Sequence, residues 1–124
     1  MGKAFYELWI WQKGYEILMK IYELTAKFPK EERYGLTAQL GSSANLVIAN
    51  IAEAHGRYYF ADKVRVLYIS RGECEETRSH LRVALGRKYI SNDEFNYLDS
   101  GYEGLSIGIN NYIQTLKERK SQLT

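Results

Sequence analysis

Apolar residues recur at alternating intervals of three and four along four long stretches of this sequence, and that spacing leaves few folds open. The last stretch is the clearest example, with one apolar face formed by Phe95, Leu98, Tyr102, Leu105, Ile109, Tyr112 and Leu116. This spacing brings the side chains of a series to one side of an α-helix. The sequence has no sustained two-residue alternation and no Asn-Gly or Asp-Gly hairpin, which are the signals of strands. We therefore expect an all-α chain.

Turn-forming residues divide the chain at 28–30, 55–58 and 86–92. The predicted helices therefore cover roughly residues 4–27, 31–55, 60–88 and 92–119. Ser91 and Glu94 form a capping box at the start of the last helix. Because short connections favour antiparallel neighbours, we predict a single domain, residues 1–124, folded as an antiparallel up-down-up-down four-helix bundle.

The first predicted helix has more apolar surface than one bundle core needs. Its two apolar lines are Leu8, Trp11, Tyr15, Leu18 and Tyr22, and Ile10, Ile17, Ile21, Leu24 and Phe28. Large exposed apolar surfaces usually mark interfaces, so the extra line predicts a partner surface. On the last helix, Gly101, Gly104 and Gly108 share one side, and each costs roughly 1 kcal/mol relative to alanine. Close approach of another helix would explain these glycines, and tolerated surface positions are the alternative.

A polar line flanks the core on the second predicted helix and consists of Gln39, Ser43, Leu46, Asn50, Glu53 and Arg57. On the third helix, Arg71 and Arg78 interrupt an apolar arc, where an unpaired buried guanidinium would be very costly. We therefore expect these arginines to meet carboxylates or a wet groove, with Glu16 or a neighbouring subunit as the partner of Arg71. The candidate polar seam consists of Gln39, Asn50, Glu53, Arg57, Arg71 and Glu76. Three interpretations of this seam are open: a hydrogen-bonded structural seam, a solvated face, or a binding site.

Composition and motifs argue against catalysis and bound metals. The single cysteine, Cys74, cannot form an intramolecular disulfide or a paired-cysteine zinc site, and its apolar neighbours predict a core position. Neither His55 nor His80 follows a glutamate by three residues, as a di-iron bundle requires. No phosphate loop, dinucleotide fingerprint or serine elbow is present. We predict a cytoplasmic, non-enzymatic protein with no cofactor, no metal, no signal peptide and no membrane span.

Positive charge is concentrated in the third predicted helix rather than in the chain as a whole. The formal net charge is +2, whereas residues 61–90 hold seven Lys/Arg against four Asp/Glu. The candidate contacts for RNA or DNA are Arg57, Lys63, Arg65, Arg82, Arg87 and Lys88. The segment 56–60 also mixes aromatic rings with a cation, a combination that either stacks on bases or plugs the end of a bundle.

Four short motifs together carry a family resemblance. They are Leu8-x-x-Trp11-Gln12-Lys13, Glu32-Arg33-Tyr34-Gly35-Leu36, Asn50-Ile51-Ala52-Glu53 and Leu67-Tyr68-Ile69-x-Arg71-Gly72. Through these motifs, over about residues 5–117, the chain resembles the bacterial four-helix-bundle family of 23S rRNA intervening-sequence proteins. Ile48, Ala54 and Glu73 stand where that family often has Pro, Gly and Ser.

The resemblance implies that copies of the bundle assemble into a ring, a homopentamer. Some members of the family are encoded within rRNA genes, and a related accessory protein of diversity-generating retroelements binds nucleic acid. We therefore expect a noncatalytic, homo-oligomeric interaction module that has itself as partner. The alternative is an RNA- or DNA-binding accessory protein that uses the basic faces of the third helix around the ring.

Overall fold

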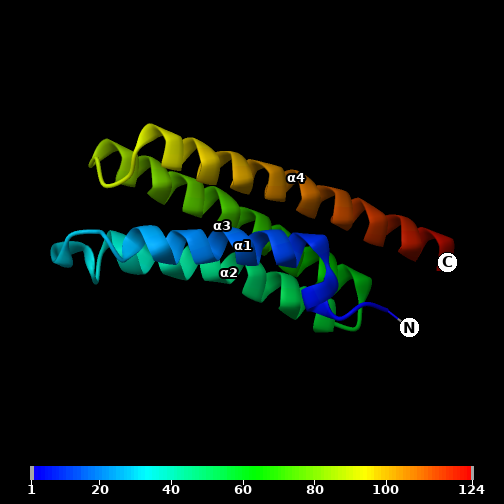
Figure 1. Cartoon of the computed structure of the whole chain (residues 1–124). Helices are drawn as coiled ribbons and strands as arrows, with labels where there is room; N and C mark the ends of the chain where they lie inside the picture. Colours follow the sequence, from blue (N-terminus) through cyan, green and yellow to red (C-terminus); the bar gives the residue numbers. More distant parts are fainter. Residues whose placement is uncertain (1, 124) are drawn as a thin grey trace.

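The computed structural model describes residues 2–123 and consists of four long helices joined by short connections (Figure 1). The helices are α1 (Trp9–Thr25), α2 (Leu36–Gly56), α3 (Phe60–Gly86) and α4 (Asn92–Leu123), with 3₁₀ turns η1 (Phe5–Glu7) and η2 (Lys30–Glu32). No strand occurs among the described residues. The expected all-α, antiparallel four-helix bundle is confirmed.

Each helix packs against its neighbours in chain order, and α1 also meets α4. The contact between α2 and α3 is the most extensive of the four, and that between α1 and α4 is the least. Consequently α1 and α3 lie at opposite corners of the bundle, as do α2 and α4. The chain termini and the α2–α3 turn lie at one end, whereas the α1–α2 and α3–α4 connections lie at the other (Figure 1).

Carboxylate caps move two helix starts away from their predicted positions. Ahead of α1, Glu7 accepts the backbone N–H of Ala4 at 2.8 Å and closes a 3₁₀ turn, so the α-helix begins at Trp9 rather than near residue 4. Ahead of α2, Glu32 accepts the N–H of Leu36 at 3.2 Å, and the helix begins there rather than at residue 31.

The predicted capping box at the start of α4 is confirmed. The Ser91 N–H donates to Glu94 Oε1 at 2.8 Å, and the Glu94 N–H donates to Ser91 Oγ at 3.0 Å. The preceding helix α3 ends at Gly86, slightly short of the expected residue 88, and Lys88 then takes a left-handed φ of 62°. At its other end α4 continues to Leu123, beyond the expected residue 119.

The core is a continuous set of apolar side chains from all four helices. On α2 one apolar line with helical spacing is buried throughout: Leu36, Leu40, Ala44, Val47, Ile51 and Ala54. On α4, Ile113 is buried and Tyr112 only partly so, because a helix with 3.6 residues per turn drifts away from strict 3.5-residue spacing.

The first helix carries large apolar side chains outside this core, and they belong to the line of Trp11, Tyr15 and Tyr22. The second predicted line, which begins at Ile10, is the one that enters the core. Tyr15 and Tyr22 are 46% and 48% exposed. Trp11 is half-buried and stacks on Tyr15, with ring centroids 5.2 Å apart. Tyr22 lies on the flank of α1 that faces α2, where its Cε1 would be 3.5 Å from a β-carbon at Gly41.

Two of the three glycines on α4 let side chains of α1 approach closely. A β-carbon at Gly101 would lie 3.0 Å from Ile17, and one at Gly108 would lie 2.7 Å from the Trp9 ring. At Gly104 a β-carbon would meet nothing within 4 Å. Close helix approach therefore explains Gly101 and Gly108, whereas Gly104 fits the alternative of a surface glycine.

Candidate functional site

The six residues of the predicted polar seam do not converge on one site. Glu53 and Arg57 form an exposed ion pair on α2, with Oε1 and Nη2 2.6 Å apart. Glu76 pairs with His80 on α3 at 3.3 Å, and Gln39 is exposed on α2. Exposed pairs within one helix contribute little to stability. These members of the seam belong to a solvated face.

Arg71 joins α3 to α4 rather than to α1. Its Nη1 donates to Asn110 Oδ1 at 2.5 Å, and its guanidinium carbon lies 4.9 Å from the centre of the Tyr68 ring. The predicted pairing with Glu16 is wrong, because α1 and α3 occupy opposite corners of the bundle. Glu16 lies 3.8 Å from Lys13 of its own helix instead. Asn50, the remaining member of the seam, is half-buried on α2.

Arg78 has the carboxylate partners that its place in an apolar arc requires. Its Nε and Nη2 donate to the two oxygens of Asp99 on α4 at 2.9 and 3.2 Å. Glu75 and Glu103 accept further hydrogen bonds from it at 3.1 and 3.3 Å. The bonds to Asp99 above all raise the pKa of Arg78 further above its usual value. This cluster fastens α3 to α4 and commits the guanidinium to a structural role.

Buried hydroxyl groups link α2 and α3 inside the bundle. The Thr77 hydroxyl donates to Ser43 Oγ at 2.8 Å, and the Ser70 hydroxyl donates to the carbonyl of Val47 at 2.7 Å. Ser43 is the one member of the polar line on α2 that enters the core. Ser43 therefore takes part in a structural hydrogen bond between α2 and α3, whereas the apolar spacing of α3 gives no sign of Ser70 or Thr77.

Cys74 is fully buried in the core, as predicted. Burial raises the pKa of its thiol to about 12, so the sulfur is protonated at neutral pH and unsuited to nucleophilic attack. Among residues 2–123, no three His, Cys, Asp or Glu side chains are grouped so that they could hold a metal ion. Within the same part of the chain, no helix combines the length and apolar character needed to cross a membrane.

The six candidate nucleic-acid contacts form two groups at opposite ends of α3. One group is Arg57, Lys63 and Arg65, and the other is Arg82, Arg87 and Lys88. At 1.5 Å per residue, the groups are about 30 Å apart along the helix axis. Arg82 and Arg87 lie over the rings of Phe95 and Tyr89 within the same chain. These six residues therefore form no continuous basic stripe on one copy.

The aromatic residues of the α2–α3 turn do not plug the end of the bundle as a group. Tyr58 and Tyr59 are 86% and 67% exposed, and only Phe60 packs against the core. The plug interpretation is wrong for both tyrosines, which lie exposed in a turn whose backbone is extended at Arg57 and Tyr59.

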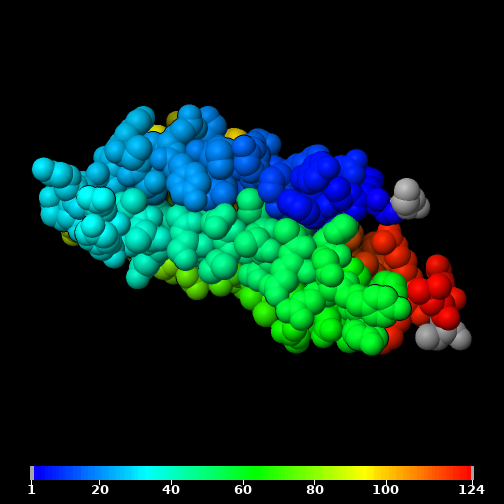
Figure 2. Space-filling view, turned by 90° about the horizontal axis from the view of Figure 1, so that it is seen from below, coloured from blue at the N-terminus to red at the C-terminus, as the bar shows by residue number. Residues whose placement is uncertain are grey.

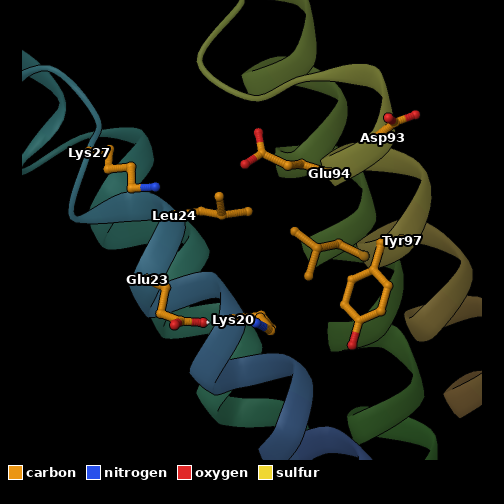
Figure 3. Close-up of a pocket in the computed structure, with 8 residues that line it drawn as sticks. Lys20, Glu23, Leu24, Lys27, Asp93, Glu94 and Tyr97 are labelled. Atoms are coloured by element: carbon orange, nitrogen blue, oxygen red, sulfur yellow. Dashed lines mark ion pairs between the residues drawn. The ribbon is translucent and has the colours of Figure 1, made fainter.

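A broad cleft of about 620 Å³ separates α1 from α4 near the α3–α4 connection (Figure 3). Lys20 and Lys27 line it from α1, and Asp93 and Glu94 line it from α4. Lys20 is already paired with Glu23 of its own helix at 3.3 Å. Exposed charges of both signs face this open cleft, so its chemistry favours no single class of ligand.

A second groove between α1 and α4, about 430 Å³ in volume, is mainly apolar, and we call it the apolar groove. Trp9 and Ile107 flank it and are each 57% exposed. Gly104 and Gly108 line it from α4 and contribute no side-chain bulk. The apolar groove lies on the flank of α1 opposite to Tyr22.

Comparison of the sequence with known proteins places the chain in a family. The sequence profile of the 23S rRNA-intervening sequence proteins matches residues 6–111, most of the chain. The chain belongs to this family. No curated protein is significantly similar to it.

The fold of this 23S rRNA-intervening sequence protein is shared with a solved structure. That structure is a 1.70 Å crystal structure of a protein with unknown function from the S23 ribosomal protein family of Bacteroides thetaiotaomicron VPI-5482. The two chains are 21% identical, with a TM-score of 0.78 over 84% of this chain and 97% of the other. The likeness establishes a common fold.

One carboxylate explains the motif at residues 32–36 of this 23S rRNA-intervening sequence protein. Glu32 accepts the Leu36 N–H through Oε1 at 3.2 Å and the Tyr89 hydroxyl through Oε2 at 2.8 Å. These hydrogen bonds, that of Tyr89 first, lower the pKa of Glu32. A β-carbon at Gly35 would lie 2.9 Å from Glu32 Oε1, so a larger residue there would displace the carboxylate from its present position. The motif is a structural tie between the α1–α2 and α3–α4 connections.

Proposed function

We propose that the chain is a noncatalytic interaction module whose copies assemble into a homo-oligomer, a homopentamer as the family resemblance implies. The observation that carries the proposal is the aromatic strip of α1, which we define as Trp11, Tyr15, Met19 and Tyr22. Tyr15, Met19 and Tyr22 are 46%, 36% and 48% exposed. A contiguous row of large apolar side chains at the surface usually marks a contact with another molecule.

The surface of α2 beside the aromatic strip supports the same conclusion. Its exposed residues are short: Ala38, Ser42, Asn45 and Ala49. Figure 2 shows α1 and α2 lying side by side along this face. Because short side chains let another helix come close, a copy that docks here gains close van der Waals contact instead of trapping water.

A closed ring requires two different surfaces on every copy, and α1 has one on each flank. The aromatic strip lies toward α2, and the apolar groove with Trp9 and Ile107 lies toward α4. In the proposed assembly, the aromatic strip of one copy packs against the apolar groove of the next.

The chemistry of the interior supports a noncatalytic role. The thiol of Cys74 is buried, and Arg78 is held by carboxylates of its own bundle. A free cysteine suits a reducing compartment, and we expect the module to work in the cytoplasm.

Light scattering coupled to size-exclusion chromatography at micromolar concentration tests the assembly. We expect about 72 kDa for five chains of 14.4 kDa. Tyr22→Glu in the aromatic strip and Ile107→Glu in the apolar groove should each give monomers, because a carboxylate would be buried unpaired in the contact. Tyr58→Glu, at a more exposed tyrosine outside both surfaces, should leave the mass unchanged.

Mixing the two interface variants distinguishes a ring from a symmetric dimer. A Tyr22→Glu chain and an Ile107→Glu chain retain one intact contact between them, so a head-to-tail ring predicts heterodimers. A wild-type chain that stays monomeric would end the proposal. An Ile107→Glu variant that keeps the wild-type mass would show that the apolar groove takes no part.

A second candidate function is RNA or DNA binding, which a cation–aromatic group on α3 and α4 favours. Lys117 Nζ donates to the Tyr68 hydroxyl at 3.1 Å, and the Arg71 guanidinium lies 4.9 Å from the same ring. Exposed rings flanked by cations bind single strands through stacking and counterion release. Filter binding of RNA at low salt should then fall steeply as salt is added, and a lack of retention at low salt would remove this candidate.

A further inference from the structure

A pocket of about 570 Å³ is lined by residues of the N-terminal segment, the α2–α3 turn and the end of α4, and we call it the end pocket. Ten residues line it, and none is acidic. Lys3, Lys63 and Arg119 bring cationic groups to it, and His55 adds an imidazole. A volume of this size is typical of small-molecule sites.

Among residues 2–123, no carboxylate pairs with the cations of the end pocket. No Asp or Glu in the part of the chain that the structure describes lies within ion-pairing distance of Lys3, Lys63 or Arg119. Asp62, in the first turn of α3, lines a neighbouring cleft instead. The end pocket therefore has an uncompensated positive charge, which favours an anion.

Lys63 is held in place by the end of α2. Its Nζ donates to the carbonyls of His55 at 2.9 Å and Ala54 at 3.4 Å. An ammonium group has three N–H donors, so one remains for a ligand. Burial lowers the pKa of Lys63, which means that its charge is incompletely solvated and would be stabilised by an anion.

His55 fixes another wall of the end pocket. Its Nε2 lies 2.6 Å from the backbone carbonyl of Lys3, and this nitrogen is the donor because a carbonyl only accepts. The bond holds the N-terminal segment across the bundle end. Aromatic rings complete the lining, with Trp9 from α1, Phe60 from α3 and Tyr112 from α4.

Uncompensated cations beside aromatic rings match an anion that carries a flat ring. Lys and Arg bind phosphate through charge-assisted hydrogen bonds, and aromatic rings stack on bases. We propose that the end pocket binds a nucleoside 5′-phosphate, either free or at the 5′ end of a strand. The phosphate contacts Lys63 and Arg119, and the base packs against Phe60. The end pocket shares Trp9 and Tyr112 with the apolar groove, but Phe60, Lys63 and Arg119 line the end pocket and not the groove, so this site goes beyond the proposed assembly.

Isothermal titration calorimetry with adenosine monophosphate tests the free ligand. Adenosine and inorganic phosphate, each lacking half of the recognised chemistry, should bind at least about tenfold more weakly than the nucleotide. Arg119→Gln should weaken nucleotide binding by about fivefold or more, because it removes one charge-assisted bond. Arg65→Gln is the matched control, since Arg65 is an exposed cation at the same end of α3 that does not line the end pocket.

Fluorescence anisotropy with labelled single-stranded RNA tests the strand end. A 5′-phosphorylated strand that binds more tightly than the same strand with a 5′-hydroxyl, while the free nucleotide does not bind, assigns the end pocket to strand ends. Lys63→Gln provides a second variant, and its melting temperature shows whether it still folds.

Three outcomes overturn the inference. They are no saturable binding of the nucleotide or the phosphorylated strand, equal affinity for adenosine and its phosphate, and equal loss in Arg65→Gln and Arg119→Gln. Light scattering on the same samples distinguishes a loss of nucleotide binding from a loss of oligomerisation, since the Arg119→Gln variant should retain the wild-type mass.

Discussion

Replacement of Gly14 by alanine tests how tightly α1 packs against α2. Gly14 is buried, and a β-carbon there would collide with Cγ2 of Ile48 on α2 and lie 3.4 Å from Leu105 on α4. Ile48 is only 6% exposed, and its Cγ2 is attached directly to a branched β-carbon. The methyl group therefore cannot swing aside, and the helices must shift to admit alanine.

The size of the effect follows from two opposing contributions. Overpacking of a core costs about 1–3 kcal/mol, while alanine gains about 1 kcal/mol over glycine in a helix. Gly72→Ala is the matched control, because Gly72 is an exposed glycine within α3, has the same helix gain, lies outside the apolar groove, and its β-carbon would meet nothing within 4 Å. We expect Gly72→Ala to raise the unfolding free energy by about 1 kcal/mol and Gly14→Ala to fall below it by about 1–3 kcal/mol.

Urea unfolding followed by helical circular dichroism measures this difference as a shift of the midpoint at constant slope. All variants must be compared at one protein concentration, because assembly adds to apparent stability by mass action. If Gly14→Ala and Gly72→Ala raise the midpoint equally, the close approach of Ile48 to α1 does not exist and the packing argument fails.

Two further predictions concern buried charge and the buried thiol. Asp99→Asn removes the two-point partner of half-buried Arg78 and should cost about 1–2 kcal/mol of unfolding free energy, whereas Glu53→Gln, which breaks an exposed pair, should barely move the urea midpoint. Equal shifts would show that the Arg78 cluster is an ordinary surface pair. Because burial raises the pKa of Cys74 from 9.0 to about 12, a thiol reagent at pH 8 should label the native chain about a thousandfold more slowly than the unfolded chain. As the pH rises, the thiol of the unfolded chain loses its proton before that of the folded chain, so the contribution of Cys74 to the free energy of unfolding is present below pH 9 and lost above it. Fast labelling of the native chain would contradict the buried position of Cys74.

Local chemistry was predictable from local sequence. The capping box of Ser91 and Glu94 depends on two residues three positions apart, and both of its hydrogen bonds are present. The core position of Cys74 follows from its apolar neighbours on one helix. In both cases the deciding interactions lie within one helix or one face.

Partners across the bundle were harder to predict. Counting residues from the turns places Arg71 at about the same height along the bundle axis as Glu16. The height of a residue does not show which helix lies next to it. Arg71 faces Asn110 of α4 because α1 lies at the diagonal corner. For Arg78 the need for a carboxylate was predictable, whereas its identity as Asp99 depends on the packing of α3 against α4.

The end pocket has no local sequence signature. Lys3, His55, Lys63 and Arg119 come from four separate segments, and only the antiparallel topology brings them together. The basic segment 117–120 near the end of α4, which contains Arg119, is the only local hint of the pocket in the sequence. Even that segment is informative only once the lengths of α2 and α4 are known to bring their ends to the same level.

The tie made by Glu32 has a mechanical consequence. The molecule has two halves, the α1–α2 pair and the α3–α4 pair. At one end the Glu32–Tyr89 hydrogen bond holds the connections of the two pairs together, and at the other end the α2–α3 turn joins the pairs covalently. The two halves are therefore joined along their length by the extensive α2–α3 contact, whereas the α1–α4 contact on the opposite side is the least extensive. Thermal opening should begin where α1 packs against α4, and amide exchange should be fastest along the facing sides of these two helices. A molecule held in the end pocket between Lys3 and Arg119 would link the N-terminal segment to α4 and so oppose the separation of α1 from α4.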